Sequence, residues 1–339
     1  MQADTREGMM PKAGQGESKG AARCLRLCAL AALCIAGTIG TAILQDASAD
    51  EGGVPFWTSG QYASLSAVPP QPGWTMTVLP YYYNGNASRS KTFQRAGRTL
   101  SAGLDTTAAF MFIQPSYAPH TTVLGGQPSF GLGFGFGGNW TSASLTLGGP
   151  GLSRSDSAGG ALDLYPVASN SWHSGSHNWM VYATGDVPVG AYESNRLSNL
   201  GIGHGAIDAG GGYTYLNEQN GREFTAVAGF TYNFENPSTN YQNGIDSHLD
   251  WAASQFLSEN WEVGVAGYAY DQLTADSGSG DRVGSFESGV AAVGPEVGYV
   301  FNVGKQQWYA NLRGYYEFWA QNRVQGYDLL MTLSMPFGD

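Results

Sequence analysis

The stretch QQWYANLRGYYEFWA, residues 306–320, alternates between two kinds of side chain. Its apolar members are Trp308, Ala310, Leu312, Gly314, Tyr316 and Phe318, and its polar members are Gln307, Asn311, Arg313 and Glu317. Alternate residues share a face in a β-strand, whereas a helix would repeat its apolar positions every three or four residues. The stretch therefore predicts a strand with one apolar face and one polar face.

The same alternation recurs in REFTAVAGFTYNF (222–234), SHLDWAASQFL (247–257) and NWEVGVAGYAYDQ (260–272). A soluble β-sandwich would also alternate, so a second signal is needed to place these strands in a membrane. Aromatic residues near the expected strand ends supply it, because such residues form girdles at the two membrane interfaces of a barrel. These are Trp74, Tyr82, Trp179, Tyr215, Trp261, Trp308 and Phe318.

The composition favours the same class of protein. Of the 339 residues, 13% are charged, against about 25% in ordinary soluble domains. Glycine occurs 49 times and aromatic residues make up 13% of the chain. The formal net charge of −11 argues against nucleic acid as a partner. We therefore expect an all-β protein, a transmembrane antiparallel β-barrel in a bacterial outer membrane.

The connections between expected strands alternate in length. Short links are expected at about 117–126, 173–176, 217–221, 258–259 and 304–306. Longer ones are expected at about 84–100, 148–161, 190–204, 236–245, 274–288 and 320–325. Such a rhythm is typical of periplasmic turns and external loops. It predicts about 12 strands, with residues 190–204 and 274–288 facing outside the cell and both termini on the periplasmic side.

The N-terminus has the features of an export signal. Basic residues precede the apolar run LCALAALCIAGTIGTAIL (27–44), and Ala47-Ser48-Ala49 offers a cleavage site. An uncleaved membrane anchor is the alternative, since 18 apolar residues can just span a bilayer. We expect residues 1–49 to be a removed signal peptide, 50–73 an N-terminal segment and 74–339 the barrel. All three cysteines lie in the leader, so disulfides and thiolate metal sites are not expected, and no cofactor is predicted.

A glycine-rich stretch, residues 201–206, matches the fingerprint G-x-G-x-x-G/A of dinucleotide-binding turns. That function needs a helix whose N-terminus faces the phosphates. The residues that follow alternate as a strand does, with Ile207, Ala209, Gly211 and Tyr213 on one side. We expect the glycines to allow a sharp loop and to leave room against a crowded barrel wall.

Several stretches resemble the family named after the meta-pathway of phenol degradation, a set of predicted outer-membrane transporters. They include GVPFWTSGQYASLSAVPPQPGW (53–74), ALDLYPVASNSW (161–172), HNWMVYATGDVPVGAY (177–192), LSNLGIGHGAIDAGGGYTYLN (197–217) and VGPEVGYVF (293–301). The resemblance implies a barrel related to fatty-acid and aromatic-hydrocarbon channels that passes small hydrophobic or aromatic solutes. The expected partners are these solutes, outer-membrane lipids and the barrel assembly machinery.

Charged residues on the polar faces are candidates to line the lumen. They are Asp186, Asp208, Glu223, His248, Asp250, Glu262, Glu296, Arg313 and Glu317. Because most are acidic, a water-filled lumen would favour neutral or cationic solutes. The alternative is hydrogen-bonded packing inside a filled barrel. Two other functions stay open, namely a lipid or ester hydrolase, which needs serine, histidine and a carboxylate together, and a structural barrel without transport.

The segment before the first strand, residues 50–73, combines four prolines with apolar side chains. Proline suits neither a central strand nor a helix interior. The apolar residues are nevertheless too many for a tail left free in water. We hypothesise that the segment enters the lumen as a plug, with Phe56 and Trp57 as anchors. A disordered tether, or a strip that docks a periplasmic partner, is the alternative.

Overall fold

A computed structural model of the protein describes residues 55–87, 92–95, 98–101, 103–145, 152–281 and 287–337. The chain divides into two units, Met1–Asp46 and Ala47–Asp339, and every described residue belongs to the second. The expected signal peptide, residues 1–49, lies outside the described residues, as do residues 50–54 of the expected N-terminal segment.

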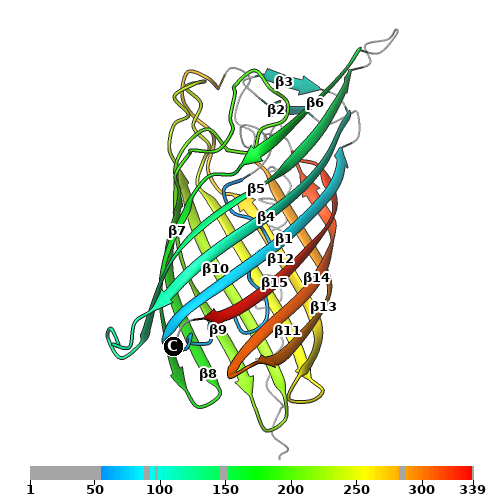
Figure 1. The fold of residues 1–339 in the computed structure, drawn as a ribbon. Coiled ribbons are helices and arrows are strands. Elements are labelled where there is room, and N and C mark those ends of the chain that lie inside the picture. The colour runs from blue at the N-terminus through cyan, green and yellow to red at the C-terminus, as the bar shows by residue number, and fades with distance from the viewer. Residues whose placement is uncertain are drawn as a thin grey trace, which may run out of the picture. The chain divides into compact units, whose positions relative to one another are not determined.

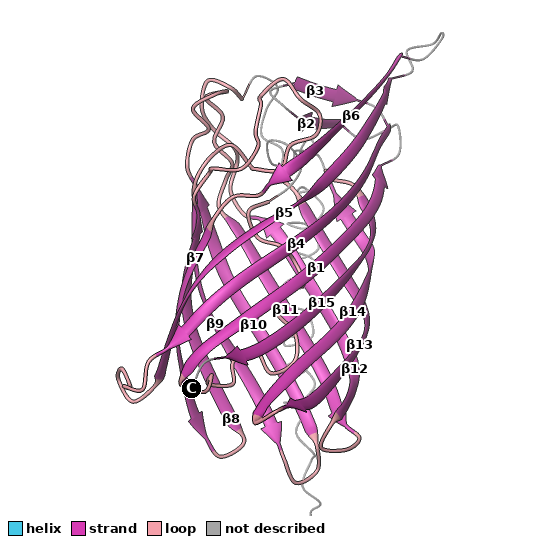
Figure 2. Cartoon of the chain, in the orientation of Figure 1, coloured by secondary structure: helices cyan, strands magenta, loops and turns pink. Residues whose placement is uncertain are grey.

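Every regular element of the described residues is a β-strand, as Figure 2 shows. The strands are β1 (Gly73–Ala87), β2 (Thr92–Arg95), β3 (Arg98–Ser101), β4 (Gly103–Ala118), β5 (Gln127–Leu145), β6 (Leu152–Ala161), β7 (Tyr165–Ser174), β8 (His177–Asp186), β9 (Ala206–Asn217), β10 (Arg222–Asn233), β11 (Asp246–Phe256), β12 (Trp261–Gln272), β13 (Gly289–Val303), β14 (Gln306–Gln321) and β15 (Gln325–Phe337). In the part of the chain described, no helix is long and apolar enough to cross a membrane.

The main sheet closes on itself as an antiparallel barrel (Figure 1). It contains 13 strands, and β4 pairs with both β1 and β5, which completes the circle. Strands β6 and β7 pair with successive parts of β5 and so share one position in the wall. The barrel therefore has 13 − 1 = 12 positions. The predicted fold of about 12 antiparallel strands is confirmed.

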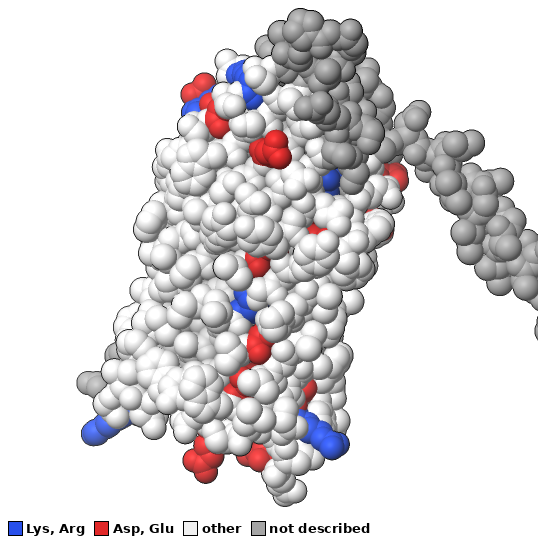
Figure 3. All heavy atoms as spheres, turned by 90° about the vertical axis from the view of Figure 1, so that its right-hand side faces the viewer, with Lys and Arg blue, Asp and Glu red and all other residues white. Residues whose placement is uncertain are grey.

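The two faces of the wall follow the alternation in the sequence. In β14, Leu312 and Tyr316 are exposed on the outside, while Arg313 and Glu317 are buried on the inside. Most of the predicted girdle residues are exposed as well, among them Trp74, Trp179, Trp261 and Phe318. Few charged side chains interrupt the wall on the face shown in Figure 3. The exterior is thus an apolar surface suited to lipid.

The connections lie at two ends of the barrel. The short-turn end carries residues 119–126, 175–176, 218–221, 257–260 and 304–305. The long-loop end carries residues 187–205, 234–245, 273–281 and 287–288 and is uppermost in Figure 1. In the region of the loop predicted at 84–100, β1 extends to Ala87, and β2 and β3 form a hairpin that ends at Ser101.

Two predicted loops are wrong in part. Residues 152–161, which are polar and rich in glycine, were expected within a loop at 148–161. They form β6, since their backbone pairs with β5 in a hydrogen-bonded ladder. The connection expected at 320–325 shrinks to residues 322–324. Asn322 there has a φ of 57°, a left-handed conformation that asparagine tolerates and that permits a tight turn. The alternation of short and long connections therefore has an exception, the connection at residues 322–324.

Candidate functional site

The N-terminal segment, residues 55–72, lies against the inner wall of the barrel (Figure 1). Its turn at Gly60 is held from two sides. The Gly60 and Tyr62 N–H groups donate to the Asp250 carboxylate of β11, at 2.8 and 3.2 Å. The Arg313 guanidinium of β14 donates to the carbonyls of Gly60 and Gln61, at 3.0 and 2.7 Å. The backbone of this turn does not pair with a strand. Its N–H groups therefore bind the acidic side chain, and its carbonyl groups bind the basic one.

Glycine is required at this turn. Gly60 has a φ of 79°, and a Cβ atom there would lie 2.8 Å from the Tyr315 ring. A second clasp follows a few residues later. The Ser64 hydroxyl lies 2.9 Å from a Glu223 carboxylate oxygen and 2.7 Å from one of Glu296. The Leu65 N–H donates to Glu223 at 3.1 Å.

Trp57 is packed in the interior. It is 2% exposed, and its ring stacks on the imidazole of His248 with centroids 3.5 Å apart. The His248 Nε2 lies 3.0 Å from Asp208 Oδ2 and 3.2 Å from the Tyr182 hydroxyl. These two contacts orient the imidazole so that one face of its ring packs against Trp57. Phe56 is half-buried, and its ring centroid lies 6.1 Å from that of Tyr165.

All nine charged residues singled out from the sequence are buried. Glu223, Asp250, Glu296 and Arg313 bind the N-terminal segment directly. His248 contacts it through Trp57, and Asp208 acts through His248. Glu262 accepts a hydrogen bond from Tyr309 in the wall, at 2.8 Å. Asp186 and Glu317 line a cavity instead.

This cavity lies between the N-terminal segment and the long-loop end. It has a volume of about 1220 Å³, including its opening to solvent. Aromatic rings make up much of its lining: Phe56, Trp57, Tyr81, Tyr83, Phe110, Phe112, Tyr165, Tyr192 and Tyr268. Leu197, Leu200 and Ile202 of the loop 187–205 also contribute. The cavity is apolar and aromatic with a few charged groups, as small-molecule sites generally are.

A second cavity of about 680 Å³ shares part of this lining. The shared side chains include Phe56, Trp57, Phe112 and Tyr165. The Tyr165 centroid lies 6.1 Å from that of Phe56 and 6.1 Å from that of Phe112. These three rings, called here the aromatic constriction, line both cavities. Phe112 and Tyr165 were missed from the sequence because they sit among many other strand aromatics with no distinguishing charge.

The glycine-rich motif belongs to the loop that borders the larger cavity. Asp163, in the break between β6 and β7, accepts hydrogen bonds from Gly190 N at 2.7 Å and Ile202 N at 2.9 Å. A Cβ at Gly201 would lie 2.8 Å from an Asp163 oxygen, and one at Gly203 would overlap the Tyr192 ring at 2.5 Å. Gly203 also has a φ of 81°. The glycines serve close approach and a sharp loop, as predicted, and β9 follows them rather than a helix.

Substituting Gly201 with alanine should loosen this loop. The new Cβ would push against the Asp163 carboxylate, so the hydrogen bonds to Gly190 and Ile202 would weaken. We expect amide exchange at Ile202 to become about tenfold faster, corresponding to about 1.4 kcal/mol. Gly159→Ala is the matched control, because its Cβ would meet nothing nearer than 3.7 Å. Equal exchange rates in the two variants would contradict this account.

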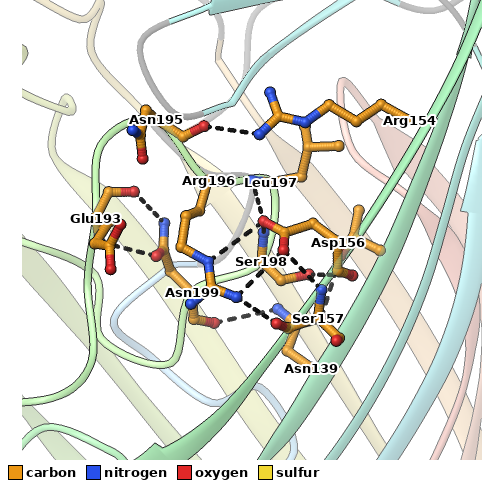
Figure 4. A network of polar contacts seen from close by, with 11 residues as sticks. Asn139, Arg154, Asp156, Ser157, Glu193, Asn195, Arg196, Leu197, Ser198 and Asn199 are labelled. Carbon is orange, nitrogen blue, oxygen red and sulfur yellow. Dashed lines mark hydrogen bonds and ion pairs between the residues drawn. The ribbon is translucent and has the colours of Figure 1, made fainter.

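A further network fastens the same loop to β6, as Figure 4 shows. The Asp156 carboxylate accepts the N–H of Leu197 at 2.9 Å and forms an ion pair with Arg196 at 3.2 Å. Arg196 also donates to the carbonyl of Ser157. Because β8 ends at Asp186, the loop takes the place beside β6 that a longer β8 would occupy.

A closed barrel with an apolar exterior, aromatic residues near its strand ends and short turns at one end is an outer-membrane β-barrel. Its interior holds an aromatic-lined cavity between the N-terminal segment and a fastened loop. Residues 88–333, well over half of the chain, match the family described as "Putative MetA-pathway of phenol degradation". The chain belongs to this family.

Comparison with solved structures supports the fold. The COG4313 outer membrane channel from Pseudomonas putida F1 is similar, with a TM-score of 0.62 and 12% identity over 80% of this chain and 98% of that chain. A FadL homologue from Pseudomonas aeruginosa has a TM-score of 0.43 and 7% identity, over 86% of this chain and 99% of that one. Of these two structures, the first has a TM-score above 0.5 and the second does not. Because the first shares 12% sequence identity with this chain, the similarity establishes the fold and nothing further. No curated protein matches the sequence significantly.

Proposed function

We propose that this protein is a channel for passive uptake of small hydrophobic or aromatic compounds across the outer membrane. The observation that carries the proposal is the cavity lined by nine aromatic side chains, whose volume of about 1220 Å³ includes its opening to solvent. An eight-stranded barrel is just filled by its side chains, and 16 to 18 strands leave an open channel. A 12-position wall leaves an intermediate lumen, and here that lumen encloses apolar space. The similar Pseudomonas putida structure bears the name of a channel.

In this proposal the N-terminal segment is the plug, and the aromatic constriction is the narrow point of the path beside it. Asp250 and Arg313 hold the segment at Gly60, where Asp250 binds the N–H group and Arg313 binds the carbonyl group. Phe56 contributes to the lining of both cavities. A solute would enter at the long-loop end, facing outside the cell, and pass Phe56 toward the short-turn end and the periplasm.

The two alternative functions have less support. A hydrolase of the triad type needs a serine beside its histidine. The Nε2 of His248 instead contacts Asp208 and Tyr182, and its Nδ1 has no hydrogen-bond partner among the described residues. His248 also lies under Trp57, which hinders access by a substrate. A purely structural barrel gives no reason for an aromatic cavity that a fastened loop borders.

Liposome swelling with the purified full chain tests the proposal. Vesicles that contain the protein should take up phenol, toluene or benzyl alcohol faster than empty vesicles do. Uptake of a disaccharide should be much slower, because the cavity is lined mainly by aromatic rings and offers a sugar few hydrogen-bond partners. Equal uptake of the aromatic solutes and the disaccharide, or uptake of neither above the empty-vesicle rate, would contradict the proposal.

A further inference from the structure

One carboxylate in the larger cavity differs from every other buried carboxylate in the described part of the chain. Asp186, the last residue of β8, is 6% exposed, and neither of its oxygens has a hydrogen-bond partner. The others each accept at least one hydrogen bond. Asp163, for example, accepts two backbone N–H groups, and Asp250 accepts two more. Asp186 lines the cavity, and its two oxygens, which have almost no exposed area, keep their full accepting capacity among the described residues.

A buried carboxylate without partners is unfavourable, because burial removes its hydration and nothing replaces it. A ligand that brings a donor to these oxygens recovers that free energy. A charged donor forms a bond about twice as strong as a neutral one. The aromatic rings around the cavity add a surface for a second ring and for a cation, which is attracted to ring faces.

The other charged groups of the cavity do not reverse this preference. Glu317 is already bound by the hydroxyls of Tyr83 and Tyr268 and by the N–H of Gly326. The Nε and Nη1 of Arg323 have no hydrogen-bond partner among the described residues, but its guanidinium lies 3.9 Å from Glu317, whose negative charge offsets its positive one. An anionic ligand is therefore disfavoured at the Asp186 side of the cavity.

We propose that Asp186 is the recognition group of the cavity, and that the preferred occupant is an aromatic ring carrying a hydrogen-bond donor, either a hydroxyl or a protonated amine. The inference rests on the proposed uptake function and names the solutes that the same cavity selects. It also assigns Asp186 a role unlike that of Asp250 and Glu223, which hold the N-terminal segment.

Calorimetric titration of the full chain in detergent tests this assignment with four ligands of similar size: phenol, benzylamine, toluene and benzoate. The wild-type protein should bind phenol and benzylamine more tightly than toluene, and benzoate most weakly. Asp186→Asn keeps one acceptor oxygen but loses the charge, so benzylamine affinity should fall at least about tenfold while toluene affinity stays unchanged. Asp186→Leu should bring phenol and benzylamine to the level of toluene.

Asp271→Asn is the matched control, because Asp271 is an exposed carboxylate on β12 and does not line the cavity. Heat-modifiable migration on gels shows that each variant is folded. Equal losses for all four ligands in Asp186→Asn, or no loss for benzylamine, would overturn the assignment. Uptake of toluene and phenol without any preference between them would overturn this inference and leave the channel standing. Absence of both binding and uptake in the wild type would refute the channel as well.

Discussion

Deleting residues 51–70 is expected to raise single-channel conductance by about threefold or more in planar bilayers. The segment fills part of a lumen that 12 wall positions leave wider than side chains alone can fill. Its removal also takes away Phe56, one of the three rings of the aromatic constriction. Discrimination between aromatic solutes and sugars should therefore weaken in the same variant.

The deletion must be compared with full-length protein refolded in parallel. Both should show β-rich circular dichroism and heat-modifiable migration, since the 12 wall positions lie outside the deleted residues. A folded deletion variant with wild-type conductance would show that the segment does not close the path.

Replacing Arg313 with alanine should release the same segment without shortening the chain. The guanidinium makes two hydrogen bonds to the Gly60 turn and two more to Asn311 and Thr332. Its loss leaves the buried carbonyls of Gly60 and Gln61 without their charged donor. Each buried acceptor left unsatisfied in this way costs about 1–3 kcal/mol. We expect conductance close to that of the deletion variant, together with lower thermal stability.

Limited proteolysis provides the second measurement for Arg313→Ala. Residues 55–72 contain no lysine or arginine, so chymotrypsin is the suitable protease, with Phe56, Trp57 and Tyr62 as sites. Cleavage there should be much faster than in the wild type. Arg313→Lys should be intermediate, because lysine keeps the charge but cannot reach four acceptors at once. Arg222→Ala, an exposed arginine at the start of β10, should behave as the wild type. Protection of the segment in folded Arg313→Ala would refute the role of this clasp.

The local pattern of the chain was sufficient for the wall. Alternation places Leu312 outside and Arg313 inside because successive side chains of a strand point to opposite faces. This rule needs no knowledge of neighbouring strands, so the approximate strand number and the inward set followed from it. Loops were harder, because β6 is polar and glycine-rich and forms a strand only through its ladder with β5.

The interior contacts depend on pairings that no local pattern contains. Gly60 and Asp250 lie 190 residues apart, and Gly60 and Arg313 lie 253 apart. The register of every intervening strand and the closure of the barrel decide which inward residues meet. A shift of two residues in any strand leaves each side chain on the same face of the wall but gives it different neighbours. The sequence by itself therefore determined an outer-membrane barrel and the side of the wall on which each charge lies. The tertiary structure alone decided that Asp250 and Arg313 hold the N-terminal segment, while Asp186 lines the cavity with no hydrogen-bond partner among the described residues.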